Sequence, residues 1–415
     1  MVAGKMSPKV SRENRQRGIA LIVVLALLGL LVGVLVVGFT GDLARQNKKQ
    51  QQTTDALAKA KEALIGWSAS RTPTGSTPNA RPGELPCPDI NNTGNDPGGC
   101  SIGAIGRVPW KSLGIPEPTD SAGETLWYAI AGPFRYYDPT NNPNPITSDT
   151  LGNLTVYLGS SASTLTSQAI AVVFAPGAAL GAQNRDPSST AICATTGTTI
   201  ARNLCAANYL EPTGGGNNAQ TGGPFIQAQP SSTFNDRLLV ITNADLMPIV
   251  EQRVAREMMS LLQSYYSTVG FYPWADNNTV PGSSAPGVNR GRFPCNALLT
   301  LPVPWGNVVP LTPLTPVLPN WLTNGCGVNG WTSVIYYTAA QNRLPAAPCT
   351  TCTAASLSVN GVSGTDLVLL TPGAAAGARM WASGYFEDAE NVNNDDNYIT
   401  PTSPAYNRDR IYTVP

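Results

Sequence analysis

Side chains that could do chemistry gather in an acidic, amide-rich stretch at 387–397. Its carboxylates are those of Glu387, Asp388, Glu390, Asp395 and Asp396. Closely spaced oxygen ligands of this kind suit Ca²⁺, and calcium is the one cofactor that the sequence suggests. The stretch lacks the glycine of an EF-hand loop. A solvated loop is therefore the favoured interpretation, and a calcium site is the alternative.

The eight cysteines form a second group with chemical potential. Cys349-Thr350-Thr351-Cys352 has the C-x-x-C spacing of redox and zinc sites, but no second C-x-x-C and no histidine accompany it. A structural disulfide is favoured there. Eight cysteines allow 105 pairings, and proximity selects four. The favoured disulfides are Cys87–Cys100, Cys193–Cys205, Cys295–Cys326 and Cys349–Cys352.

The absence of histidine argues against a Ser-His-Asp hydrolase and against most transition-metal sites. An enzyme would have to use carboxylates alone, and Glu211 and Glu387, which recur in the two halves, would be the first candidates. Asp236-Arg237 and Asp409-Arg410 also recur. We expect them to anchor the last strand of each half through charge-assisted hydrogen bonds.

The N-terminus carries the topological information. Five basic residues precede Gly18, and the run 19–39 that follows contains no charged residue. At roughly 1.5 Å per residue such a helix reaches about 30 Å, the thickness of a bilayer core. Basic residues on the N-terminal side predict that this end stays in the cytoplasm. The sequence thus predicts a single-pass inner-membrane protein with its remainder periplasmic or extracellular.

This boundary resembles the leader of type IV pilins and of type II secretion pseudopilins. The residues that carry the resemblance are Arg15-Gln16-Arg17-Gly18 and Ile19-Ala20-Leu21-Ile22. In that family a prepilin peptidase cuts after the glycine, and the new N-terminus is often methylated. The resemblance implies cleavage between Gly18 and Ile19 and an N-methylated Ile19. Val23 stands where most pilins have Glu, which favours a minor or tip subunit.

The chain also repeats itself, because the same markers occur in one order in both halves. Matched markers are Leu85-Pro86-Cys87 with Phe293-Pro294-Cys295, Leu126-Trp127-Tyr128 with Ile335-Tyr336-Tyr337, and Pro176-Gly177 with Pro372-Gly373. The predicted parts are a leader (1–18), a membrane and assembly helix (19–39), its amphipathic continuation (40–68), a first module (69–243) and a second module (244–415).

Periodicity predicts the elements inside the modules. A helix beginning near Asn243 or Asp245 would bury one stripe of side chains. That stripe is Met247, Val250, Val254, Met258, Leu261 and Tyr265. Val-, Ile- and Tyr-rich segments predict strands at 125–131, 152–158, 168–175, 237–242, 332–338, 366–371 and 410–414. Five tryptophans, Trp110, Trp127, Trp274, Trp321 and Trp331, are expected to pack a core rather than stack on a sugar.

The predicted fold is α+β: a long N-terminal helix, half of it membrane-spanning, followed by two duplicated pilin-like modules, each a helix on a small antiparallel sheet. The predicted function is a non-enzymatic structural subunit of a type IV pilus or type II secretion-type filament. Its expected partners are the inner membrane, other pilin-like subunits and a prepilin peptidase. No basic stripe suggests a nucleic-acid partner. The alternatives are a filament-tip or membrane-anchored adhesin and a membrane-anchored exported enzyme.

Overall fold

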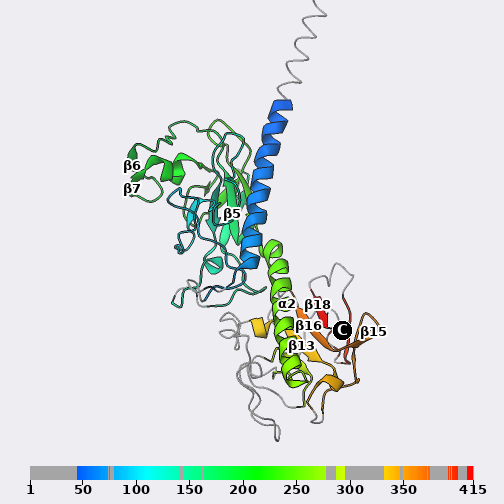
Figure 1. Cartoon of the computed structure of the whole chain (residues 1–415). Helices are drawn as coiled ribbons and strands as arrows, with labels where there is room; N and C mark the ends of the chain where they lie inside the picture. Colours follow the sequence, from blue (N-terminus) through cyan, green and yellow to red (C-terminus); the bar gives the residue numbers. More distant parts are fainter. Residues whose placement is uncertain are drawn as a thin grey trace, which may run out of the picture. The chain divides into compact units, whose positions relative to one another are not determined.

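The computed structural model describes most of the chain from residue 44 onward (Figure 1). The described residues are 44–72, 74, 79–140, 142, 144–159, 163–276, 287–294, 331–345, 349–371, 373, 391, 393, 395–400 and 409–414. The chain divides into two compact units, Met1–Asp55 and Ala56–Pro415. In the first unit the described residues, 44–55, are helical, and every side chain except Thr53 is exposed.

Two α-helices occur in the described residues: one at 44–70, and α2 (Asn243–Val269). Neither is long and apolar enough to cross a membrane, because both carry charged side chains along their length. This finding corrects the predictions of a membrane-spanning N-terminal helix, of a single-pass inner-membrane protein and of the fold class built on them. The apolar run 19–39, on which those predictions rested, lies outside the described residues.

The first module is built on a four-stranded antiparallel sheet. Its strands, in spatial order, are β1 (Ile105–Arg107), β2 (Trp127–Ile130), β5 (Ala171–Ala175) and β11 (Arg237–Ile241). β2 and β5 are buried at every position, as expected for central strands covered on both faces. On the helical segment 56–70, Leu57, Ala60 and Leu64 belong to the same buried cluster as these strands.

A second sheet in this module has the order β10 (Phe225–Gln227), β3 (Leu154–Leu158) and β4 (Ser163–Ala169). β10 and β3 are parallel, whereas β3 and β4 are antiparallel. Two small hairpins complete the strands: β6 (Thr190–Ile192) with β7 (Thr199–Ala201), and β8 (Pro212–Thr213) with β9 (Gly216–Asn217). The 3-10 helices η1 (Gly132–Phe134), η2 (Arg202–Leu204) and η3 (Ala206–Asn208) lie in the loops.

The second module repeats both sheets. Its four-stranded antiparallel sheet has the order β12 (Arg290–Arg292), β13 (Tyr336–Ala339), β16 (Leu367–Thr371) and β18 (Arg410–Val414). Its three-stranded sheet has the order β15 (Val362–Thr365), β14 (Leu357–Val359) and β17 (Asn397–Tyr398), with β14 and β17 parallel. Its 3-10 helices are η4 (Trp331–Ser333) and η5 (Gln341–Arg343). The single antiparallel sheet predicted for each module is therefore wrong: in the described residues each module has a four-stranded antiparallel sheet and a three-stranded mixed sheet, and the first module has the two small hairpins besides.

Helix α2 precedes the strands of the second module. It begins after Thr242, whose backbone amide and hydroxyl both donate to the Asp245 carboxylate at 2.8 Å. Such a contact satisfies groups that a helix N-terminus leaves without partners. The helix ends at Gly270, which has φ of 84° and donates to the carbonyl of Tyr266. A glycine takes this left-handed conformation without steric cost.

Candidate functional site

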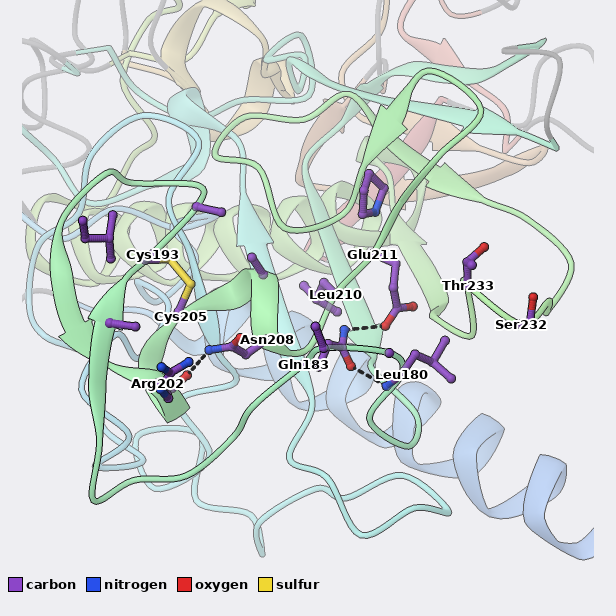
Figure 2. Close-up of a pocket in the computed structure, with 17 residues that line it drawn as sticks. Leu180, Gln183, Cys193, Arg202, Cys205, Asn208, Leu210, Glu211, Ser232 and Thr233 are labelled. Carbon is purple, nitrogen blue, oxygen red and sulfur yellow. Dashed lines mark hydrogen bonds between the residues drawn. A yellow bond between two sulfur atoms is a disulfide. The ribbon is translucent and has the colours of Figure 1, made fainter.

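A pocket of about 380 Å³ lies in the first module, between the end of β5 and the start of β11 (Figure 2). Its walls come from the loop after β5, the β6–β7 hairpin, the η2 and η3 turns and the residues that follow η3. Aliphatic side chains of Leu180, Ile192 and Leu210 line it together with the polar side chains of Gln183 and Glu211. Pockets of this size and mixed lining are typical of small-ligand sites.

One wall of the pocket is fixed by a disulfide. Cys193 follows β6 directly and is joined to Cys205, which lies between η2 and η3. The Cys193 amide also donates to the Thr198 carbonyl at 2.8 Å, which closes the hairpin turn. Ile192 at the rim remains 72% exposed. The hairpin is thus covalently tied to the 3-10 turns and presents an aliphatic side chain at the mouth of the pocket.

Glu211 is the buried carboxylate of the pocket, with 5% of its surface exposed. Its Oε1 accepts a hydrogen bond from Gln183 Nε2 at 2.7 Å, and its Oε2 accepts one from the Asn235 amide at 3.0 Å. Gln183 is itself oriented, because its Oε1 accepts from the Leu180 amide and from Arg185 Nη2, both at 2.9 Å. The carboxylate of Glu211 therefore has a fixed position before any ligand arrives.

Beneath Glu211 lies a second buried carboxyl group, that of Asp236 at the start of β11. Its Oδ2 accepts from the Glu211 amide at 2.9 Å and from Asn218 Nδ2 at 3.0 Å. Burial and the neighbouring Glu211 carboxylate raise the pKa of Asp236 well above its ordinary value.

Asn218 completes this arrangement and has a counterpart in the second module. Asn218 donates to the Ile226 carbonyl at 3.1 Å and accepts from the Ile226 amide at 2.8 Å. Asn391 makes the same pair of bonds with Ile399, at 3.1 and 2.9 Å, and also donates to Asp409 Oδ2 at 3.3 Å. The sequence predicts Asn391 only as part of the acidic, amide-rich stretch and does not predict this contact for either asparagine, although the spacing Asn218 to Asp236 recurs as Asn391 to Asp409.

The duplicated Asp-Arg pairs therefore act in part as expected. Asp236 and Asp409 each accept a hydrogen bond from the matching buried asparagine just before the last strand. Arg410 instead forms an ion pair with Glu251 of α2, whose side chain is almost fully buried. Ser148 of the first module also donates to Glu251. The polar contacts of these motifs hold loops and a helix against strand ends.

The predicted acidic cluster divides between described and undescribed residues. Glu387, Asp388 and Glu390 lie outside the described residues. Asp395 accepts from the Asn397 amide, and Asp396 Oδ1 forms a 3.0 Å ion pair with Arg290. Asp396 Oδ2 accepts from the amide and hydroxyl of Thr353 at 2.7 and 2.8 Å. Among the described residues, no group of three or more acidic or cysteine side chains could hold a metal ion.

The cysteines and tryptophans are placed as follows. Disulfides join Cys87 with Cys100, Cys193 with Cys205, and Cys349 with Cys352, whereas Cys295 and Cys326 lie outside the described residues. Trp127, Trp274 and Trp331 are buried in the core. Trp110 is half-buried, and Trp321 lies outside the described residues, as do Gly18 and Ile19 at the predicted cleavage site.

The pocket wall comes from a segment that is longer in the first module. Between the end of the third sheet strand and the buried asparagine, the first module has the 42 residues 176–217, and the second has the 19 residues 372–390. Sequence reasoning had named Glu211 as a place to look, but Gln183 and Arg202, which also line the pocket, were not recognised.

No protein-family model, curated protein or solved structure matches this chain.

Proposed function

We propose that this chain is a structural subunit of a pilin-like filament, in a minor or terminal position. The observation that carries the proposal is the helical segment 44–52. Its side chains are exposed on every face, and they include Arg45, Lys48 and Lys49. These first turns of the 44–70 helix have no apolar face of their own, and a polar helical segment of this kind can bridge to another chain or domain. Neighbouring subunits would be the other chains.

The leader is the second basis of the proposal. The basic residues before Gly18 and the apolar residues from Ile19 are the features that a prepilin peptidase recognises in pilin-like proteins. The two modules behind it, with disulfide-stapled loops, suit a rigid head that is displayed rather than chemically active. Assembly of such subunits would be head-to-tail, which generates a helical array.

The test is mass spectrometry of the mature N-terminus in cells with and without the prepilin peptidase. The expected result is a chain that begins with methylated Ile19 only when the peptidase is present. Gly18→Ala serves as the matched variant, because it changes the residue before the cut and leaves every described residue unchanged. A mature chain that never begins at Ile19 would overturn the proposal.

A second measurement addresses assembly directly. Cysteine pairs placed in the exposed helix, for example at Asn47 and Gln51, should give intermolecular cross-links in cells that assemble filaments. The same substitution at Val362, an exposed residue of the second module, serves as the control. Equal cross-linking at both places, or none at the helix, would argue against packing of this helix on neighbouring subunits.

A further inference from the structure

We propose that the first-module pocket binds a small zwitterionic ligand, an amino acid or a dipeptide. In this arrangement Glu211 receives the ammonium group and Arg202 receives the carboxylate. This inference goes beyond the proposed structural role and does not depend on filament assembly.

The charges of the lining residues lead to this ligand class. Glu211 and Arg202 are the acidic and the basic side chain among the residues that line the pocket. In the view of Figure 2, Gln183 and Asn208 lie between them, so the two charges stand apart from each other. A ligand that satisfies both must itself carry one positive and one negative group, separated by a short polar or aliphatic body.

Glu211 has capacity for an additional donor. An ionised carboxylate can accept about four hydrogen bonds. Gln183 and the Asn235 amide supply two of them. A ligand ammonium would supply a further one. Because Glu211 is almost fully buried, such a bond would be shielded from water and correspondingly strong.

Arg202 has a fixed backbone and a half-buried side chain at the pocket wall, where it could bind an anion. Its backbone is fixed, since its amide donates to the Ser189 carbonyl at 3.0 Å and its carbonyl accepts from Asn208 Nδ2 at 2.7 Å. Its side chain is half-buried at the pocket wall. The nearby Asp186 is fully exposed; the hydrogen bonds from the Ser188 amide and hydroxyl, and to a lesser degree the Arg202 charge, lower its pKa. A ligand carboxylate bound to the planar guanidinium in bidentate geometry would replace this solvent-screened attraction.

The pocket size and walls restrict the body of the ligand. About 380 Å³ is at the lower end of the range for small-ligand sites and suits one or two amino-acid residues. Leu180, Ile192 and Leu210 offer aliphatic contact, and none of the described residues that line the pocket is aromatic. An aliphatic side chain therefore fits better than a sugar ring, which commonly stacks on an aromatic face.

The added segment supports a role beyond folding. The second module keeps the asparagine–aspartate anchor with a connection of 19 residues (372–390), so the sheet does not require the longer first-module connection. That longer connection adds the hairpin, its disulfide, Gln183 and Arg202, whereas Glu211 has a sequence counterpart in Glu387. A stapled insertion that builds a pocket with prearranged charges is a typical way in which a binding site is added to an existing fold.

The experiment is isothermal titration of the full chain with the dipeptide alanyl-leucine and with leucine. Two capped controls, N-acetyl-alanyl-leucine and alanyl-leucine amide, lack the ammonium and the carboxylate respectively. We expect one of the free ligands to bind and each capped form to bind about tenfold more weakly or not at all. Leucine and the dipeptide distinguish an amino-acid site from a peptide site.

Variants assign the two charges. Glu211→Gln should lower the affinity for the free ligand about tenfold and leave the affinity for the acetylated ligand unchanged. Arg202→Gln should lower the affinity for the free and acetylated ligands and leave the affinity for the amide form unchanged. Glu257→Gln and Arg253→Gln are matched controls, because this pair lies on α2 and does not line the pocket.

If Glu211→Gln does not fold, Arg202→Gln still tests the proposal, because Arg202 lies outside the Glu211–Asp236 pair. Absence of binding up to about 10 mM, or equal binding of free and capped ligands, would overturn the proposal. An absence of ligand binding would not change the expected N-terminal processing, and an absence of processing at Ile19 would not change the expected ligand binding.

Discussion

Among the described residues, the ion pairs with both side chains buried are Arg81 with Glu84 in the first module and Arg290 with Asp396 in the second. The two pairs occupy different places. Glu84 lies before β1 and also accepts from the Tyr137 amide, whereas Asp396 directly precedes β17 and binds the loop at Thr353. The sheets that these pairs support nevertheless have the same order and the same strand senses.

The difference indicates which contacts define the repeated fold. The asparagine–aspartate anchor recurs with the same hydrogen bonds in both modules, so it belongs to the repeated frame. Ion pairs, disulfides and the long connection at 176–217 differ, so each module secures its loops in its own way. Strand order is set by apolar burial, and loops around it can change more freely.

The largest expected effect is the loss of a buried ion pair. Glu84→Gln should lower the free energy of unfolding by about 3–5 kcal/mol, because Arg81 would be left as an uncompensated buried charge. Asp396→Asn should act similarly through Arg290. Denaturant unfolding measures the loss, and amide exchange shows where it falls. Exchange that accelerates in both modules after either change would contradict separate stabilisation of the loops.

A matched exposed pair provides the control for these substitutions. Arg343 and Asp366 are also 3.0 Å apart, but their side chains are 40% and 19% exposed. Arg343→Gln should therefore cost less than about 1 kcal/mol. A loss as large as that of Glu84→Gln would mean that burial does not separate the two kinds of pair.

Disulfides give the next largest contrast. Cys87 and Cys100 are separated by 13 positions, whereas Cys349 and Cys352 are separated by 3. Loop-closure entropy predicts that replacing the first pair by alanine costs about 3 kcal/mol and the second about 1.5 kcal/mol. Thermal unfolding of the two double variants would measure this order. The reverse order would show that native contacts around the cysteines outweigh loop length.

The shared anchor should respond equally in both modules. Asn218→Ala leaves the amide and carbonyl of Ile226 without their side-chain partner, and Asn391→Ala does the same to Ile399. Each change should cost about 2 kcal/mol, the penalty for unsatisfied buried polar groups. Urea unfolding of both variants is the measurement. A large effect in one module with none in the other would remove the anchor from the repeated frame.

How far the sequence predicts this frame depends on the kind of element. Apolar segments predicted the central strands well: 168–175 contains β5 and 366–371 contains β16. The α2 stripe was right at five of its six positions, with Leu262 buried in place of Leu261. The edge strand β4 was missed because its residues are mostly polar and exposed, so no alternation of burial marks it.

The repeat was also misaligned at one marker. Leu85-Pro86-Cys87 precedes β1, whereas Phe293-Pro294 follows β12, so the two do not occupy equivalent positions. The isolated bridges Asp89 to Arg107 and Asp276 to Arg292 show the proper match, in which Cys87 corresponds to Trp274. The shared Pro-Cys dipeptide suggested the wrong match, because its position relative to the neighbouring strand differs between the two modules. The pocket was missed because its residues are distant in sequence and meet only through the hairpin.

The last effect depends on pH and concerns Asp236, whose pKa is raised in the folded chain by burial and by the neighbouring Glu211. The unfolded chain loses this proton at lower pH than the folded chain does. The proton therefore contributes stability below the ordinary carboxyl pKa, and this contribution falls as pH rises toward the raised value. The Asp236→Asn variant has no proton to lose at this position, so its free energy of unfolding should not fall in this way as pH rises.

The two unfolding free energies should therefore diverge with a slope of up to about 1.4 kcal/mol per pH unit above about pH 4, in favour of the variant. Urea unfolding of both proteins across a pH series is the measurement. Parallel profiles would mean that Asp236 is ionised in the folded chain.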